Sequence, residues 1–143
     1  MKAVTVADLV AGGVASVHLD SLPPCPRRFV RMFKPRFAPL VKSGRKRQTV
    51  RPSPARMPRR GDLISLRMWA GRPYASRHVV LREAEIVDVQ PVCIEDVGVL
   101  VGGRGVDAES FAKADGFDCF AEMLDWFRAE HRADGFQGIV IFW

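Results

Sequence analysis

Apolar residues recur at helical or strand spacing over most of the chain. Phe37, Leu40 and Val41 lie at positions i, i+3 and i+4, a spacing that predicts a short helix. Gly44 follows and tolerates the left-handed conformation in which many helices end, so we expect the helix to stop there. Residues 49–51 are β-prone and predict a strand that ends at the next proline.

Strand patterns fill the middle of the chain. Apolar and polar residues alternate over 63–69, as expected for a half-buried strand. A β-rich run follows from 78 to 94, and its charged residues indicate that one side faces water. Residues 96–101 are expected to pair back as a hairpin strand. The glycine-rich residues 102–105 predict a turn, because they lack the lysine and hydroxyl residue that complete a P-loop.

Helical spacing returns in the last third of the chain. Asp107 is a good N-cap for a short helix over 108–114, and an Asp-Gly pair closes that helix. Asp118 is expected to cap a second helix whose apolar face is formed by Phe120, Met123, Leu124 and Phe127. Residues 136–143 predict a terminal strand.

Together these elements predict an α+β fold. The tally is about five or six strands and three short helices without a βαβ rhythm, which favours a small curved sheet or β-barrel with flanking helices. The length of 143 residues fits one domain. We expect that domain to occupy residues 27–143. Residues 1–26 end in a proline-rich linker and are interpreted as an N-terminal extension.

The charges are separated along the chain. Residues 21–61 contain 13 Lys or Arg and no acid, whereas residues 83–134 hold 13 acids against four basic residues. The net charge of +6 therefore hides a basic face. Such a face favours RNA, a nucleoside or a nucleotide as the ligand, ahead of an acidic membrane surface. The oligomeric state stays open.

Several other classes of protein are not indicated. The three cysteines are widely spaced without a CxxC pair, and a secretory signal is not recognisable, which favours a reduced cytoplasmic setting. No apolar run approaches the ~18 residues of a membrane span. The three histidines share no ligand spacing, so we expect neither a metal nor another cofactor.

The residues suited to binding or catalysis are concentrated between Gly44 and Pro52. The cations of this stretch predict a phosphate cradle, and a basic loop over 53–60 extends it; the alternative is a solvated basic face. The candidate binding residues are Arg45, Arg47, Arg51, Arg59 and Arg60.

Lys46 and Thr49 are the most reactive pair in that stretch. A hydroxyl becomes a nucleophile when a nearby base takes its proton, and a desolvated lysine with a lowered pKa is such a base. The two residues have opposite parity on a regular strand, so a turn or bulge must separate them if both point into one site. The alternative is a phosphate-binding lysine and an ordinary strand hydroxyl.

Two further residues are candidates for the same site. Asp115, at a helix end, can act as a general base or accept a hydrogen bond from a base edge; alternatively it is a cap or a surface acid. Trp69 can stack on a nucleobase, as can Tyr74. Phe117 is better interpreted as core.

The order of these motifs resembles that of the ASCH domain, and in particular its short bacterial and prophage-encoded members. The resemblance covers roughly residues 29–143. It is carried by the Phe37…Leu40-Val41 helix, Gly44-Arg45-Lys46-Arg47-Gln48-Thr49-Val50-Arg51, Gly61-Asp62-Leu63, Asp115-Gly116-Phe117…Met123…Trp126-Phe127 and the closing Gly138-Ile139-Val140-Ile141-Phe142-Trp143.

The resemblance implies a PUA-like β-barrel with flanking helices and a role with RNA or nucleobases. One bacterial branch of the family hydrolyses N4-acetylcytidine with a lysine, a threonine and a carboxylate, which match Lys46, Thr49 and Asp115. The chain has an aspartate where that branch has a glutamate. Another branch is a ribonuclease for single-stranded RNA and depends on the motif lysine.

The leading hypothesis is therefore a hydrolase whose cleft binds a nucleobase or RNA. In it Arg45 and Arg51 hold the ligand, Lys46 activates Thr49 or a water, and Asp115 completes the proton relay. A non-catalytic RNA-binding module is the first alternative. A prophage-encoded protein that docks its basic face on an acidic partner is the second.

Overall fold

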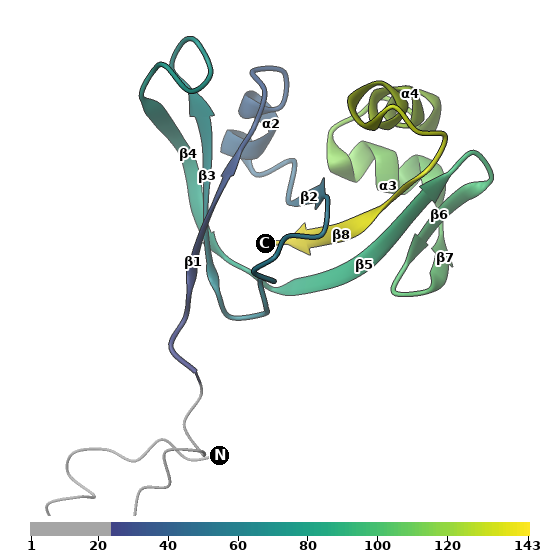
Figure 1. The fold of residues 1–143 in the computed structure, drawn as a ribbon, viewed down its shortest axis with the longest axis horizontal. Helices are drawn as coiled ribbons and strands as arrows, with labels where there is room; N and C mark the ends of the chain where they lie inside the picture. Colours follow the sequence, from purple (N-terminus) through teal and green to yellow (C-terminus); the bar gives the residue numbers. More distant parts are fainter. Residues whose placement is uncertain (1–23) are drawn as a thin grey trace, which may run out of the picture.

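The computed structural model describes residues 24–143, which form an α+β fold of two sheets and three helices (Figure 1). Most of the predicted N-terminal extension, residues 1–23, lies outside the described residues. The smaller sheet has the order β1-β3-β4. Its strands are β1 (Arg28–Met32), β3 (Leu63–Trp69) and β4 (His78–Glu85). β1 runs parallel to β3, and β4 runs antiparallel to β3.

The larger sheet is antiparallel and has the order β2-β8-β5-β6-β7. Its strands are β2 (Gln48–Arg51), β8 (Phe136–Phe142), β5 (Asp88–Glu95), β6 (Gly98–Val101) and β7 (Arg104–Val106). β8 lies between β2 and β5 and pairs with both of them along its C-terminal half. The strand that precedes the site is therefore held by the last strand of the chain.

The two sheets remain open, so the predicted closed barrel is not what the strand pairing of residues 24–143 forms. The chain passes from one sheet to the other at Ile86 and Val87. Ile86 N–H donates to the carbonyl of Asp62 in the smaller sheet, at 2.8 Å, and Val87 N–H donates to that of Phe142 in the larger one, at 2.9 Å. The predicted run over 78–94 is thus two strands joined by a bend.

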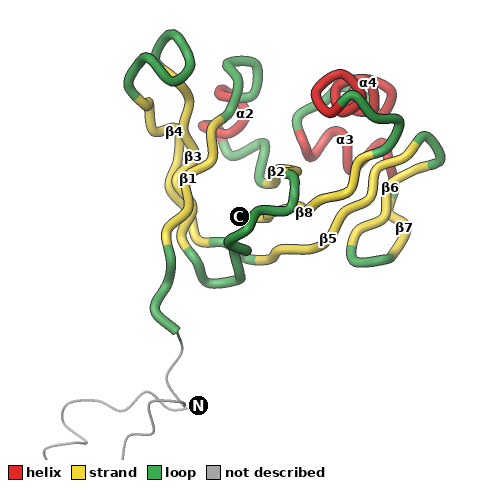
Figure 2. Tube along the Cα trace, in the orientation of Figure 1, coloured by secondary structure: helices red, strands yellow, loops and turns green. Residues whose placement is uncertain are grey.

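Three helices cover the sheets (Figure 2). α2 (Ala38–Ser43) packs against β3 and β4, α3 (Ala108–Asp115) contacts β2 and β6, and α4 (Phe120–His131) contacts β8. None of the helices in this described part of the chain is long and apolar enough to cross a bilayer.

The predicted helix ends are confirmed with one exception. Gly44 ends α2 with φ at +83°, and the Asp107 carboxylate accepts the N–H of Ser110 at the start of α3. The exception is α4, whose N-cap is Cys119 and not Asp118.

Two strands were not predicted. In β1, Phe29 is buried while its neighbours Arg28 and Val30 are exposed, and its parallel partner β3 lies more than thirty residues away, beyond the reach of local pattern. β7 has three exposed residues and is stabilised only by pairing with β6, so its glycine-rich sequence predicts a turn.

The core lies between the helices and the sheets. Phe117, Phe127 and Trp143 are buried in it, as predicted, and Phe120 packs against it while half-buried. Phe117 and Phe127 also line the cavity of the candidate site.

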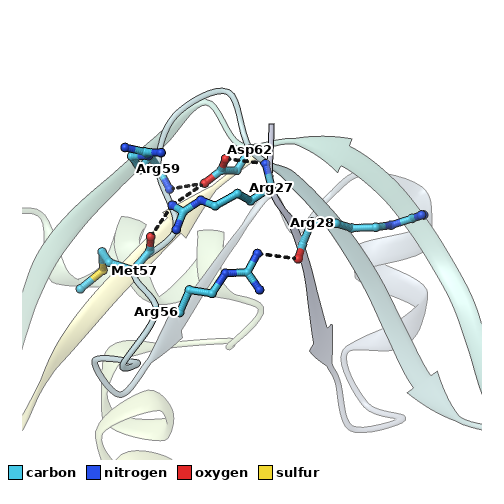
Figure 3. Close-up of polar contacts among 6 residues, drawn as sticks. All are labelled: Arg27, Arg28, Arg56, Met57, Arg59 and Asp62. Carbon is cyan, nitrogen blue, oxygen red and sulfur yellow. Dashed lines mark hydrogen bonds and ion pairs between the residues drawn. The ribbon is translucent and has the colours of Figure 1, made fainter. Parts of the chain in front are cut away.

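A buried carboxylate fixes the entry of the chain into this fold (Figure 3). Asp62 accepts the backbone N–H groups of Arg27 and Arg59, both at 2.9 Å, and the Arg27 guanidinium at 3.0 Å. That guanidinium also donates to the carbonyl of Met57 at 2.7 Å. Burial alone would raise the pKa of Asp62, but these donors outweigh it and lower the pKa below its ordinary value. The basic loop is therefore tied to the start of β1.

Candidate functional site

The turn after α2 directs Lys46 into the interior. Gly44 ends the helix in the left-handed conformation, and Lys46 N–H then donates to the carbonyl of Leu40 at 2.9 Å. The Lys46 side chain is only 3% exposed and passes beside Gly116, where a Cβ atom would lie 3.0 Å from the Phe37 ring and 3.3 Å from Lys46 Cδ. Glycine at that position makes the close packing over the lysine possible.

Lys46 meets Asp115 at the end of α3. Its Nζ lies 3.4 Å from Asp115 Oδ1 and donates to the main-chain carbonyl of the same residue. A cation at the C-terminus of a helix satisfies an unpaired carbonyl and complements the helix dipole. Gln48 Nε2 donates to Asp115 Oδ1 at 3.4 Å. Asp115 is buried and so is neither the surface acid nor the simple C-terminal cap that its sequence position also allowed.

Burial acts on both members of this pair. It lowers the pKa of Lys46, and the Asp115 carboxylate opposes that effect. It raises the pKa of Asp115, and Lys46 and Gln48 oppose that effect. Both directions favour a neutral lysine and a neutral acid, so transfer of one proton interconverts the charged pair and the neutral pair.

Thr49 and Arg51 lie on the same face of β2. Arg51 Nε donates to Thr49 Oγ1 at 3.1 Å, and an Arg51 Nη donates to the carbonyl of Met32 at 2.7 Å. The Arg51 guanidinium also lies 4.9 Å from the centre of the Phe33 ring. Burial lowers the pKa of Arg51 to about 10, and Arg31 adds to the effect. No hydrogen bond joins Lys46 to Thr49 within residues 24–143.

A cavity of about 210 Å³ opens onto this group. Its polar wall includes Thr49, Arg51 and Asp115, and its aromatic wall is formed by Phe33, Phe37, Phe117, Trp126 and Phe127. Sites for drug-sized ligands are larger, at about 300–1,000 Å³. The cavity is therefore of a size for a single planar ring held between aromatic edges and hydrogen-bonding groups.

This chain matches no protein-family model, no curated protein and no solved structure. What the site does is accordingly inferred from its geometry.

The other predicted binding residues lie away from that cavity. Arg45 is exposed and lines a separate recess of about 90 Å³, of which Lys46 also forms part of the wall. Arg47 donates through Nε to the Trp143 carbonyl at 3.3 Å. Arg59 and Arg60 line an open groove of about 480 Å³ beside β5 and β8.

Trp69 lies at the end of the β3–β4 hairpin. Its ring centre is 5.2 Å from that of Tyr74 and 4.5 Å from that of His78. Trp69 is not among the residues that line the cavity, whereas Phe117, which the sequence assigned to the core, does line it. As for metals, no group of three His, Cys, Asp or Glu side chains suited to an ion occurs in the described region.

Several contributors were missed by sequence reasoning. Gln48 contacts Asp115, and its even spacing from Lys46 was a usable signal. Arg36 lies over the Phe37, Phe117 and Trp126 rings, 4.9–5.4 Å from their centres, and pairs with Glu122. No local pattern identifies this stacking, because the rings come from α2, the loop after α3, and α4.

Proposed function

We propose that this chain is a cytosolic ASCH-like, PUA-like protein whose cavity binds a nucleobase and hydrolyses an acyl group from its exocyclic amine. One observation carries the proposal: Asp115, which lines a cavity that fits a single ring, is paired in the interior with the buried Lys46. A pair that only stabilised the fold would not need to lie next to a cavity.

The chemistry follows from the proton that Lys46 and Asp115 share. In the neutral form of the pair, Lys46 accepts the proton of an attacking water, directly or through Thr49. The water oxygen bonds to the acyl carbon, the C–N bond breaks, and the lysine returns the proton to the leaving amine. N4-acetylcytidine and water thus give cytidine and acetic acid, which releases its proton to the solvent as acetate. Arg51 donates to the oxygen on which negative charge develops.

The test measures release of cytidine from N4-acetylcytidine and cleavage of short single-stranded RNA. We expect the wild type to release cytidine and Lys46→Ala to lose that activity. Cleavage of the RNA without release of cytidine would replace acyl hydrolysis by a ribonuclease activity. Lys42→Ala is the matched control, because Lys42 is an exposed lysine at the end of α2. Thr49→Val replaces the hydroxyl with a methyl group of similar size. Loss of activity in this variant would indicate that the water proton reaches Lys46 through Thr49, and retained activity would indicate direct transfer. Undiminished activity in a folded Lys46→Ala would refute the mechanism.

A non-catalytic RNA-binding module is the second candidate. It is favoured by one contact: the Thr49 hydroxyl accepts from Arg51 and not from Lys46. This candidate predicts RNA affinity that falls with salt at a log–log slope set by the phosphates contacted, and no turnover of either substrate.

A further inference from the structure

Three arginines contact one aromatic ring, that of Phe29, beside the candidate site. One of them, Arg27, lies 5.2 Å from the ring centre and is paired with Asp62. The other two come from different segments and have no such partner among residues 24–143.

The Arg56 guanidinium carbon lies 4.4 Å from the centre of the Phe29 ring, and that of Arg31 lies 5.5 Å from it. Arg31 belongs to β1, whereas Arg56 reaches β1 from the basic loop and donates to the carbonyl of Arg28 at 3.4 Å (Figure 3). The fold therefore brings both side chains together.

Arg51 completes a group of three. It lies on Phe33, which points to the same side of β1 as Phe29 and Arg31 because side chains alternate along a strand. Burial lowers the pKa of Arg31, and Arg56 lowers it further. Arg31 in turn contributes to the lowered pKa of Arg51. The shared Phe29 ring places Arg31 beside Arg56, and the neighbouring Phe33 ring places Arg51 on the same side of β1. We call Arg31, Arg51 and Arg56 the arginine cluster.

The cluster is not neutralised by the rest of the described fold. Five ion pairs form among residues 24–143, and none of them contains Arg31, Arg51 or Arg56. Asp115 attracts Arg51, but that carboxylate is already paired with Lys46. Three positive charges therefore lie together, one of them largely removed from water, which is unfavourable unless an anion joins them.

We propose that the arginine cluster binds a phosphate group of the ligand whose base occupies the cavity. Arg51 belongs to both sites, and Pro52, which begins the loop that carries Arg56, also lines the cavity. Guanidinium groups bind phosphate through paired N–H donors, and Phe29 and Phe33 hold their planes in place. This inference rests on the proposed function and narrows its substrate class to a nucleotide or RNA, in preference to a free nucleoside.

The test compares ligands that differ only in phosphate. Calorimetry would measure the Kd of cytidine, cytidine 5′-monophosphate and cytidine 3′-monophosphate. We expect at least one nucleotide to bind ten times more tightly than cytidine or better. Arg56→Ala and Arg31→Ala should each reduce that ratio several-fold. Arg104→Ala is the matched control, because it removes one exposed positive charge on β7 and should leave the ratio unchanged.

A separate arm uses inorganic phosphate, which needs no base pocket. Phosphate should raise the Tm relative to chloride at equal ionic strength, and the increase should shrink in Arg56→Ala, whose exposed side chain makes a folding defect easy to exclude. If cytidine and both nucleotides bind equally, the phosphate site is refuted while the proposed base site stands. If phosphate binds through the cluster but no nucleoside binds, the proposed function fails and the anion site stands. If phosphate stabilises Arg56→Ala as much as wild type and no nucleotide preference depends on the cluster, the inference is wrong.

Discussion

Replacement of Lys46 by methionine tests the buried pair most directly. Methionine keeps an unbranched side chain of similar length, so the main change is the loss of the ammonium group. Asp115 then stays buried with a single side-chain donor, Gln48 Nε2 at 3.4 Å, and loses the cation that also contacts its main-chain carbonyl. Burial already raises the pKa of Asp115. In the variant, Lys46, which opposes this increase most strongly, is gone.

The expected cost is large for one substitution. Removal of one partner from a buried ion pair typically destabilises by about 3–5 kcal/mol, and the total stability of a small domain is roughly 5–15 kcal/mol. The cost should fall as the pH is lowered through the raised pKa of Asp115. Between that pKa and the lower pKa of the unfolded chain, the folded variant binds a proton at Asp115 that the unfolded chain does not, so the stability of the variant rises as the pH falls.

Urea unfolding of four proteins measures the effect: wild type, Lys46→Met, Asp115→Asn and the double variant. We expect the double variant to recover much of the loss, with a coupling energy of about 1–3 kcal/mol. A cost below about 1 kcal/mol for Lys46→Met, or additive single effects, would refute the view that the pair is buried and coupled. A cost that grows at lower pH would refute the raised pKa that burial gives Asp115.

Two further predictions concern the framework of the site. A Cβ atom at Gly138 would lie 2.2 Å from the carbonyl oxygen of Arg51. Gly138→Ala should therefore destabilise the fold by at least about 2 kcal/mol and weaken ligand binding. Gly105→Ala is the control, because open space surrounds that position and the stability should change little. Equal effects of the two substitutions in urea unfolding would contradict the packing of β2 on β8. Because the folded state lowers the pKa of Asp62, the stabilisation by that carboxylate is present above its unfolded pKa and lost as the pH falls through its folded pKa. The stability difference between wild type and Asp62→Asn should therefore be constant at neutral pH and narrow as the pH falls below about 5. A difference that stays constant in acid would mean that the charge of Asp62 is irrelevant.

Local patterns predicted the elements whose stability is local. The helix ended by Gly44, the Asp107 cap, the strand over 49–51 and the terminal strand all lie where the sequence places them. β1 escaped prediction because its partner is distant, and β7 because only pairing with β6 makes it a strand. The bend at 86–87 was also missed, since it depends on hydrogen bonds to two different sheets.

The candidate site divides in the same way. The concentration of cations, the reactive pair Lys46 and Thr49, and the carboxylate at the end of a helix are visible as residue types and spacing. Which of these residues come into contact is not visible in the sequence. Asp115 lies 69 positions from Lys46, and Arg56 contacts β1 from a loop that is also tied to the start of that strand by Asp62.

The sequence by itself determined the basic character of residues 21–61, the helix and strand periodicities, and the presence of a lysine, a hydroxyl and a carboxylate suited to hydrolysis. Only the tertiary structure decided that Lys46 pairs with Asp115 while Thr49 accepts from Arg51, and that Arg31, Arg51 and Arg56 lie together without a carboxylate of their own among residues 24–143. The physical reason is that composition and periodicity are properties of neighbouring residues. Burial, pairing and the pKa of a charged group depend on which distant segments pack against it.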